Sequence, residues 1–174
     1  MHPLVMKIML VKWPGITKEN STSTDFVIIE DFFPTILELA KIDGYKTVQT
    51  VDGKSFTPIL KGEKQDNANR ALIWHYPNNW GPTGPGIGAT STIRKGDWKL
   101  IYYHLDGSFE LFNITADIGE TTNLASKEGE KLQALANELS TYLRSVDAQM
   151  PTNTNTNELV PFPDNEFVLK PYLK

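Results

Sequence analysis

Two candidate binding residues of this 174-residue chain lie in Trp74-His75-Tyr76 and the Gly- and Pro-rich loop that follows. Loops held by a rigid sheet concentrate binding residues. Trp80 in this loop is a candidate to stack on a sugar ring, or equally to pin the loop down. Arg94 is a candidate for a bidentate contact with an anionic substrate, or for a structural salt bridge on the sheet surface.

Residues for nucleophilic or metal chemistry are scarce. The chain has no Cys, which excludes thiolate catalysis, disulfides and Cys-based metal sites. The spacing of Asp117–Glu120 differs from that of an EF-hand loop and indicates a turn. His104 stands beside the turn Asp106-Gly107 and is expected to be an exposed hairpin residue. We therefore predict no catalytic and no metal-binding residue in this chain.

The composition is that of a globular domain, with 40% apolar and 22% charged residues. A net charge of −4 argues against a nucleic-acid or anionic-membrane surface. No stretch is long and apolar enough to span a bilayer. The apolar run Met1–Val11 is interrupted by Lys7, and no cleavage site precedes Trp13-Pro14-Gly15, so we predict a buried strand at Lys7–Lys12 and no signal peptide.

The remaining elements follow from periodicity and turn signals. A helix is predicted over Asp31–Ile42, with Asp31 as N-cap and Gly44 as its stop. The run Phe26–Ile29 before it is either a strand or a lead-in. Antiparallel strands are predicted at Ala71–Tyr76, Ser91–Arg94, Trp98–His104 and Phe109–Asn113.

An amphipathic helix, Lys127–Val146, is predicted to cover one face of this sheet, with Ser126 as its cap. Its apolar face comprises Leu132, Leu135, Leu139, Tyr142, Leu143 and Val146. After Asp147 the chain is rich in Pro and in alternating Thr and Asn, and we expect an extended arm without helix.

Six short motifs occur in the order that type I sulfatases show. They are KWPG at 12–15, DFFPTILELA at 31–40, DGKSFTPILKG at 52–62, ALIWHYP at 71–77, IRKGDWKLI at 93–101, and ELFN with Asp117 to Leu124 at 110–124. Each motif alone is of modest specificity, but six in the correct order are highly specific. The chain therefore resembles the C-terminal portion of a type I, formylglycine-dependent, arylsulfatase-like sulfatase.

The resemblance implies an α+β fold: the end of an alkaline-phosphatase-like α/β domain, followed by a small antiparallel four-stranded sheet with a packed C-terminal helix. Residues 1–62 would be the last strand and helix of the large domain, 63–150 the C-terminal subdomain, and 151–174 an extended arm. The loop after His75 would lie near the mouth of the active site. His75 is then a candidate, with Trp80 and Arg94, to bind substrate; the alternative is a strand-end histidine packed under the loop.

The family's catalytic residues are absent from this sequence. Its nucleophile is a formylglycine made from Cys or Ser in a C/S-x-P-S/A-x-R motif, and the chain has neither a Cys nor such a Ser. The paired aspartates and the Asp-Asn pair that hold calcium are also absent, because Asp66-Asn67 and Asp164-Asn165 have the wrong context. Calcium and formylglycine are thus expected only in a parent sulfatase, and the chain alone is predicted to be inactive.

The first functional hypothesis is a C-terminal segment of a sulfatase that completes the fold and shapes the leaving-group side of the pocket. Its partner would be the N-terminal catalytic part, and its substrate a sulfated carbohydrate or aryl sulfate ester. The alternatives are a stand-alone carbohydrate-binding or interaction module and a non-functional gene fragment. Localisation stays open: members of the family are often periplasmic or secreted, and this chain shows no signal peptide.

Overall fold

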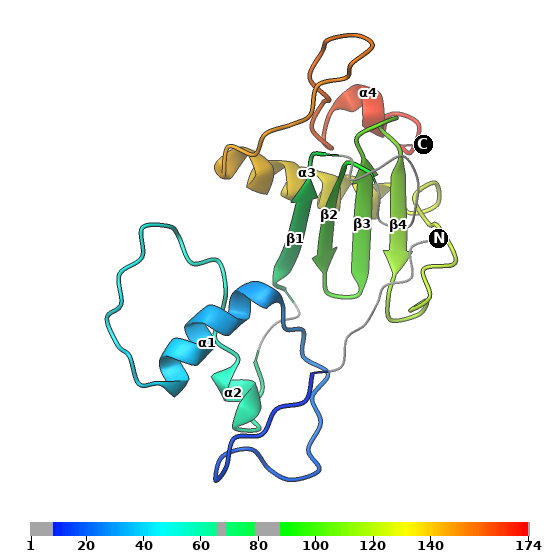
Figure 1. Ribbon diagram of the computed structural model, residues 1–174. Helices are drawn as coiled ribbons and strands as arrows, with labels where there is room; N and C mark the ends of the chain where they lie inside the picture. The colour runs from blue at the N-terminus through cyan, green and yellow to red at the C-terminus, as the bar shows by residue number, and fades with distance from the viewer. Residues whose placement is uncertain (1–8, 66–68, 79–87, 174) are drawn as a thin grey trace. The chain divides into compact units, whose positions relative to one another are not determined.

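The computed structural model describes residues 9–65, 69–78 and 88–173, and the chain divides into two compact units, Met6–Arg70 and Ala71–Lys174 (Figure 1). Each unit has its own set of packed segments. Within the described residues, no helix has both the length and the apolar character needed to cross a membrane.

The described residues of Ala71–Lys174 form a four-stranded antiparallel sheet whose strands lie in sequence order (Figure 1). The strands are β1 (Ala71–Tyr76), β2 (Thr90–Lys95), β3 (Trp98–Tyr103) and β4 (Phe109–Asn113). Gly96 and Gly107 supply the positive φ angles, 56° and 72°, that the tight connections after β2 and β3 require. The strands predicted from the sequence are confirmed to within one residue at each end.

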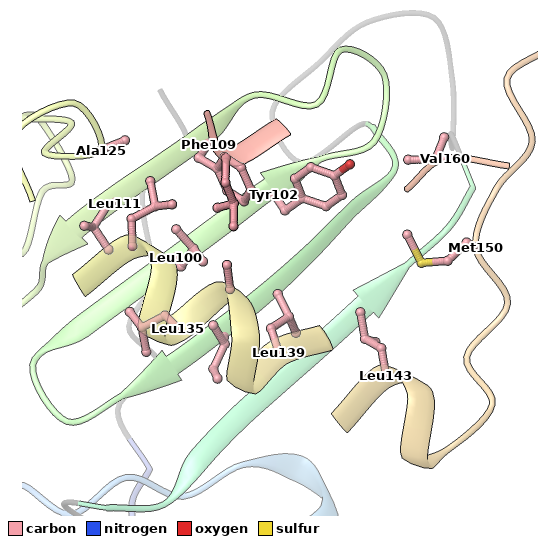
Figure 2. Packing of buried hydrophobic residues seen from close by; sticks show 14 residues of the cluster. Leu100, Tyr102, Phe109, Leu111, Ala125, Leu135, Leu139, Leu143, Met150 and Val160 are labelled. Carbon is pink, nitrogen blue, oxygen red and sulfur yellow. The ribbon is translucent and has the colours of Figure 1, made fainter. Parts of the chain in front are cut away.

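The register of the sheet directs one row of apolar side chains to the same face. Ile73 pairs with Ile93, Ile93 with Leu100, and Leu100 with Leu111. Because side chains alternate between faces along a strand, Tyr102 shares this face with Leu100. Figure 2 shows Leu100, Tyr102 and Leu111 on the side of the sheet where the core lies.

Helix α3 (Gly129–Ser145) covers this face, as its amphipathic pattern predicts (Figure 2). Its buried residues are Leu132, Leu135, Ala136, Leu139, Ser140 and Leu143. Burying one leucine side chain contributes about 1.5–3 kcal/mol, so this stripe supplies much of the driving force for folding of the unit. Val146, predicted on the same face, is 52% exposed because the helix ends at Ser145.

The cap predicted for α3 is wrong. The helix begins at Gly129 and its N-cap is Glu128, so Ser126 lies in the preceding turn. The Glu128 N–H donates to the Leu124 carbonyl oxygen at 2.9 Å, which closes that turn. A Cβ on Gly129 would lie 2.5 Å from the Tyr172 carbonyl oxygen. The C-terminal segment therefore packs directly against the first turn of α3, where only glycine fits.

The arm beyond residue 150 contains a helical turn, α4 (Glu166–Leu169), which corrects the expectation of an arm without helix. Its N-cap Asn165 accepts a hydrogen bond from the Phe167 N–H at 2.9 Å. The arm's prolines flank this turn instead of interrupting it, so their number was a poor guide to the structure.

The arm is also anchored to the sheet. The Tyr102 hydroxyl donates to the Pro161 carbonyl oxygen at 2.9 Å, and the Phe109 N–H donates to the Tyr172 hydroxyl at 3.1 Å. Its buried side chains include Val160, Pro163 and Leu169, and Met150, directly before the arm, is buried as well. These contacts extend the core of the unit beyond the sheet and α3.

The unit Met6–Arg70 contains helices in its described part: the short 3-10 helix η1 (Ile29–Asp31), α1 (Phe32–Leu39) and α2 (Thr57–Leu60). The predicted helix is therefore confirmed in type, and it begins close to the expected residue. It ends three residues earlier than the predicted Ile42.

The end of α1 explains this difference. Lys41 adopts a positive φ of 56°, and its N–H donates to the Glu38 carbonyl oxygen at 3.0 Å. The Ile42 N–H donates to the Leu37 carbonyl oxygen at 3.0 Å. This pair of bonds is the Schellman pattern that closes many helices. Lys41, and not the predicted Gly44, therefore stops the helix.

The predicted strand Lys7–Lys12 is wrong for the part that the structure describes. Residues 9–12 form no strand, and Leu10 is 93% exposed; Lys7 and Ile8 lie outside the described residues. A strand needs a neighbour, and residues 9–65 and 69–70 contain none with which a ladder can form. For Phe26–Ile29 the sequence left two alternatives, a strand or a lead-in to the helix. The segment leads into η1.

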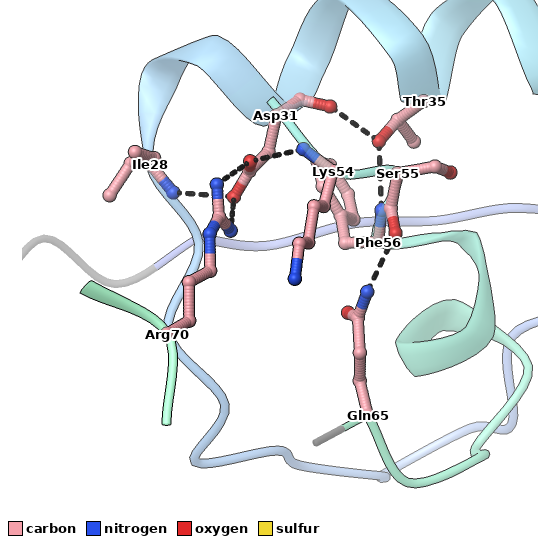
Figure 3. Close-up of polar contacts among 8 residues, drawn as sticks. All are labelled: Ile28, Asp31, Thr35, Lys54, Ser55, Phe56, Gln65 and Arg70. Atoms are coloured by element: carbon pink, nitrogen blue, oxygen red, sulfur yellow. Dashed lines mark hydrogen bonds and ion pairs between the residues drawn. The ribbon is translucent and has the colours of Figure 1, made fainter. Parts of the chain in front are cut away.

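A buried polar network joins the segments of this unit (Figure 3). Arg70 Nη1 and Nη2 donate to Asp31 Oδ2 and Oδ1 at 2.9 and 2.7 Å. The backbone N–H groups of Ile28 and Lys54 donate to the same carboxylate at 3.1 and 2.8 Å. Asp31 does stand before α1, but its side chain does not cap the helix, because these partners hold the carboxylate.

Electrostatics of the network favour the ionised carboxylate. Burial alone would raise the pKa of Asp31, but the Arg70 guanidinium and the N–H groups of Lys54 and Ile28 outweigh burial and hold the pKa below its ordinary value. The side chain of Asp31 is 2% exposed and that of Arg70 is 10% exposed, so solvent screens this ion pair little.

The motif residues around Asp31 pack closely. The Thr35 hydroxyl donates to the Asp31 carbonyl oxygen at 2.6 Å and accepts from the Phe56 N–H at 3.0 Å. A Cβ on Gly53 would lie 1.9 Å from the Glu30 carbonyl oxygen, so the turn at Gly53 can approach η1 only because it is glycine.

We predict that Leu139→Ala lowers the free energy of unfolding by about 2–5 kcal/mol, because it leaves a cavity between α3 and the sheet. Val146→Ala, at the exposed residue that follows the helix, should change it by less than about 0.5 kcal/mol. Urea unfolding followed by far-UV circular dichroism measures both. Equal losses in the two variants would contradict the core assigned to this unit.

We predict that Arg70→Gln costs about 3–5 kcal/mol within the unit Met6–Arg70, since it leaves the buried Asp31 charge without its cation. Hydrogen exchange at the Lys54 and Ile28 amides measures this loss locally. Arg144→Gln breaks the exposed Arg144–Asp164 pair and should cost about 1 kcal/mol or less. Unchanged exchange at Lys54 in the Arg70 variant would refute the role given to the ion pair.

Candidate functional site

His75, the first predicted site residue, lies near the C-terminal end of β1 and uses both ring nitrogens. Its Nδ1 lies 2.8 Å from the Ser91 Oγ on β2, directly opposite in the register. Its Nε2 lies 3.0 Å from the Gln149 carbonyl oxygen, just beyond α3. His75 therefore links two neighbouring strands to the segment that follows the helix.

His104 joins the same cluster, which corrects its predicted place as an exposed hairpin residue. It is 4% exposed, and its Nε2 lies 2.8 Å from the Ser91 Oγ. Its ring packs against Tyr102 and His75, with centroids at 5.4 and 5.6 Å. The arm that follows α3 packs beside the hairpin and helps to bury this histidine.

The hydrogen-bond partners determine the tautomers of the cluster. The Gln149 carbonyl oxygen can only accept, so His75 Nε2 carries the proton and, in the neutral ring, Nδ1 accepts. The Ser91 hydroxyl must then donate to His75 Nδ1 and accept from His104 Nε2–H. The chain of donors thus runs from His104 through Ser91 and His75 to the backbone at Gln149.

The electrostatics agree with a neutral His104 ring. Burial, and secondarily the charge that His75 would carry, lowers the pKa of His104 to about 4. A protonated His104 would also need a second acceptor, for Nδ1–H, and Nδ1 has no hydrogen-bond partner among the described residues. The arrangement is stable with neutral His104.

The cluster is suited to positioning and not to nucleophilic catalysis. Ser91 is fully buried, so its hydroxyl cannot reach a substrate although two histidines flank it. What the cluster does is tie β1, β2 and the Gln149 segment together. A ligand that took a hydrogen bond from His75 Nε2 would have to displace the Gln149 carbonyl oxygen.

Arg94, the second predicted residue, lies elsewhere on the sheet. It pairs with Leu72, three residues before His75 on β1, which separates the two by about 10 Å along the strand. Side chains three positions apart point to opposite faces. Burial lowers the pKa of Arg94, while the charges of Glu120 and Asp97 oppose that shift. Arg94 thus faces a carboxylate-bearing environment on the face opposite α3.

The neighbour of Arg94 on that face is a buried ion pair. Lys99 Nζ contacts both carboxylate oxygens of Glu120, at 2.8 and 2.9 Å. The two side chains are 12% and 2% exposed. This pair fixes the loop after β4 on the sheet, and its carboxylate also favours the charged form of Arg94.

The three predicted substrate-binding residues are not gathered into one described site. His75 and Arg94 lie on opposite faces, and Trp80 lies outside the described residues. The residues that sequence reasoning missed are Ser91 and His104. The pairing of the strands could have identified them. Ser91 lies opposite His75 on β1 and opposite Tyr102 on β3, and His104 follows Tyr102 by two residues.

Metal ligation finds no support among the described residues. They contain no group of three His, Cys, Asp or Glu side chains that could hold a metal ion. Asp117, which the sequence analysis assigned to a turn, accepts from the Thr121 and Thr122 N–H groups at 2.8 Å. These backbone bonds hold its carboxylate in a loop.

We predict that the free energy of unfolding falls as the pH drops from about 6.5 to about 4. His104 has a lowered pKa in the folded state, so in this window the unfolded chain binds a proton that the folded chain does not. The loss should reach roughly 3 kcal/mol. Stability is fully present above pH 6.5 and declines toward the pKa of about 4 in the folded state.

Urea unfolding at a series of pH values measures this slope. His104→Gln keeps an amide in place of the ring and removes the titration, so its slope between pH 6.5 and 4 should be much shallower. The lowered pKa values of Asp31 and Asp164 act below this window. Identical slopes in the variant and the parent chain would show that His104 does not cause the dependence.

Comparison with known proteins gives a consistent picture. The family model for the C-terminal part of N-sulphoglucosamine sulphohydrolase matches residues 2–149. A sulfatase of Formosa agariphila is 35% identical over 179 residues, covering 95% of this chain and 32% of that protein. Human N-acetylglucosamine-6-sulfatase is 31% identical over 144 residues, covering 67% of this chain and 26% of that protein.

Solved structures agree in fold. A Bacteroides thetaiotaomicron structure classed with the sulfatases superimposes with a TM-score of 0.52 at 22% identity, over 78% of this chain and 30% of that one. The chain spans about a quarter to a third of the length of the relatives it matches. Since the family model covers most of the sequence, this chain belongs to the N-sulphoglucosamine sulphohydrolase C-terminal family and corresponds to the C-terminal portion of a sulfatase.

Proposed function

We propose that the chain works as the C-terminal segment of a sulfatase whose sulfate-ester hydrolysis depends on a preceding catalytic part. The observation that carries this proposal is the match over residues 2–149 to the C-terminal part of proteins three to four times longer. The sequence has no Cys to become formylglycine, and its described residues do not fit a calcium site. The nucleophile and the metal would both belong to the catalytic part.

An exposed apolar face on the unit Met6–Arg70 supports this proposal. Ile29, Phe32, Phe33 and Ile36 recur at intervals of three and four residues and are 76%, 37%, 47% and 58% exposed. Soluble proteins rarely leave a contiguous apolar surface of this kind in water. We propose that the catalytic part covers this face.

The same reasoning applies to the segment before Trp13. Residues 9–12 are apolar enough for a buried strand but have no described strand beside them. In the proposed whole protein, residues 1–62 complete the large domain and supply its last strand and helix. Residues 63–150 then form the C-terminal subdomain, and 151–174 the arm.

The substrate is proposed to be a sulfated carbohydrate or an aryl sulfate ester. Support for a sugar comes from the name of the human relative, an N-acetylglucosamine-6-sulfatase. His75, Trp80 and Arg94 remain proposed contacts with its leaving group. Because His75 and Arg94 face opposite sides of the sheet, they would contact different parts of the substrate or of the pocket wall.

We predict that a chimera in which this chain replaces the C-terminal third of the Formosa agariphila sulfatase hydrolyses an aryl sulfate, whereas the isolated chain does not. Phe33→Asp or Ile36→Asp in the chimera should lower activity at least about tenfold, because each places a charge in a buried interface. Release of the aryl alcohol measures activity, and gel filtration measures assembly.

Two controls make this test specific. Val146→Asp changes an exposed apolar residue in the other unit, 52% exposed, and should leave the chimera active. The circular dichroism of the isolated Phe33→Asp chain should match that of the parent, since the side chain is already exposed. Turnover by the isolated chain, or full activity of the Phe33→Asp chimera, would refute the proposal.

A further inference from the structure

The two edge strands of the sheet, β1 and β4, differ in how their backbone groups are satisfied (Figure 1). At the β4 edge, the Leu111 N–H donates to Asn123 Oδ1 at 3.0 Å. The Leu111 carbonyl oxygen accepts from the Leu124 N–H at 2.8 Å. The loop after β4 therefore covers that edge, and β1 is the edge to which the same question applies.

The register shows which backbone groups of β1 face outward. In an antiparallel sheet, opposite residues alternate between hydrogen-bonded and non-hydrogen-bonded pairs. Leu111 bonds to the loop, so it forms a non-hydrogen-bonded pair with Leu100. Leu100 is then hydrogen-bonded to Ile93, and Ile93 is not hydrogen-bonded to Ile73. The N–H and C=O groups of Ile73 therefore point away from β2.

The same alternation turns the backbone groups of Ala71 and His75 outward. Among residues 9–65, 69–78 and 88–173, no other segment forms a hydrogen bond with the backbone of Ala71, Ile73 or His75. β1 also lacks the features that commonly protect an edge strand, since it contains no Lys, Pro or Gly. An edge of this kind is a template on which another strand can pair.

An apolar groove adjoins this edge, between β1 and α3. Its volume is about 420 Å³, and its described lining is Ala71, Ile73, Glu138, Thr141, Tyr142 and Ser145. We call it the β1 groove. A residue that pairs with Ile73 from outside would project its side chain to the same face of the sheet, and hence to the groove.

The charge near the groove is compensated within the chain. Glu138 is the one carboxylate in the described lining, and Lys95 Nζ contacts both of its oxygens at 2.8 and 2.9 Å. β1 itself carries no Asp, Glu, Lys or Arg. The surface therefore favours an uncharged partner strand, because a charged side chain would lose water here without gaining a free counter-ion.

The sequence of β1 is complementary to a second copy of itself. When two β1 strands pair antiparallel about Ile73, Ile73 lies opposite the partner's Ile73, and Ala71 lies opposite the partner's His75. On the other face, Leu72 lies opposite the partner's Trp74, whose side chain is 44% exposed in the single chain. Apolar and aromatic pairs of this kind stabilise neighbouring strands, and no like charges meet.

The size of the contact sets its strength. A strand of six residues is about 20 Å long, and the sheet and α3 are each about 10 Å thick, so each copy would bury roughly 400 Å². A standard stable interface buries about 800 Å² on each partner. The contact is therefore expected to be weak, with a dissociation constant on the order of 0.1 mM.

We propose that two copies of this chain pair antiparallel through β1, about a two-fold axis at Ile73. The two sheets become continuous, and each Ile73 side chain adjoins the β1 groove of the other copy. The proposal concerns a surface of the unit Ala71–Lys174 and does not depend on the proposed role in sulfate-ester hydrolysis.

Sedimentation equilibrium of the full chain between about 10 µM and about 1 mM tests the proposal, and a reversible monomer–dimer equilibrium is expected. Trp74→Lys should raise the dissociation constant at least about tenfold, because it places two ammonium groups near each other across the axis. Leu105→Lys adds the same charge at a residue that is 84% exposed in the turn after β3, and should leave dimerisation unchanged.

A further control addresses the exposed apolar face of the other unit. Phe33→Asp should not alter dimerisation, since Phe33 lies outside the unit that carries β1. Loss of the dimer in the Phe33 or Leu105 variant would assign the contact to another surface and overturn the proposal. A chain that stays monomeric at about 1 mM, or a Trp74→Lys variant that dimerises like the parent, would also overturn it.

Amide hydrogen exchange locates the contact without a substitution. The Ala71, Ile73 and His75 amides should exchange about fourfold more slowly at about 1 mM than at about 10 µM, in proportion to the monomer that remains. The Leu72 and Trp74 amides should change little, because β2 already protects them. A dimer that leaves Ile73 exchange unchanged would contradict the proposal. Full protection of Ile73 at the lower concentration would contradict it too, because the edge would then be covered within one chain.

Discussion

The covering of one sheet face by α3 is the constraint on which the unit Ala71–Lys174 depends. Four antiparallel strands bury little by themselves, and the row through Ile93, Leu100 and Leu111 would face water without the helix. The leucine stripe of α3 removes that row from solvent, and Met150 together with Val160 and Leu169 of the arm extends the same core. Polar groups along this seam are then shielded from water, and leaving them without a partner inside the protein is costly.

The cluster of His75, Ser91 and His104 is a consequence of that demand. The register that aligns Ile73 with Ile93 also aligns His75 with Ser91, two residues further along β1 and on the same face. A histidine in this position is next to the core, so its nitrogens are satisfied by Ser91 and by the backbone after α3. The hydrogen bond to Gln149 fixes where the arm begins, and the arm in turn buries His104.

Strands and helices that depend on signals within one segment were predicted correctly from the sequence. Side-chain roles that depend on partners far along the chain were not. The strands and α3 were predicted correctly because turn glycines and apolar periodicity lie within each segment. Asp31 was assigned as a helix cap because its partner Arg70 is 39 residues away. His104 was assigned to the surface because the arm that buries it comes some 50 residues later in the sequence. His75 and Arg94 were grouped in one site because only the strand register shows that they face opposite sides.

In this chain, residues of the motifs shared with sulfatases make contacts that hold the fold together. Asp31, Thr35 and Gly53 meet in one buried network that Arg70 closes. Asp97 accepts from the Thr115 hydroxyl at 2.6 Å, and Lys99 pairs with Glu120. Asn123 Oδ1 accepts from the Leu111 N–H at 3.0 Å, and the Leu124 N–H donates to the Leu111 carbonyl oxygen at 2.8 Å, which satisfies the outer edge of β4. Because these residues hold segments together, their presence is evidence for the fold before it is evidence for catalysis.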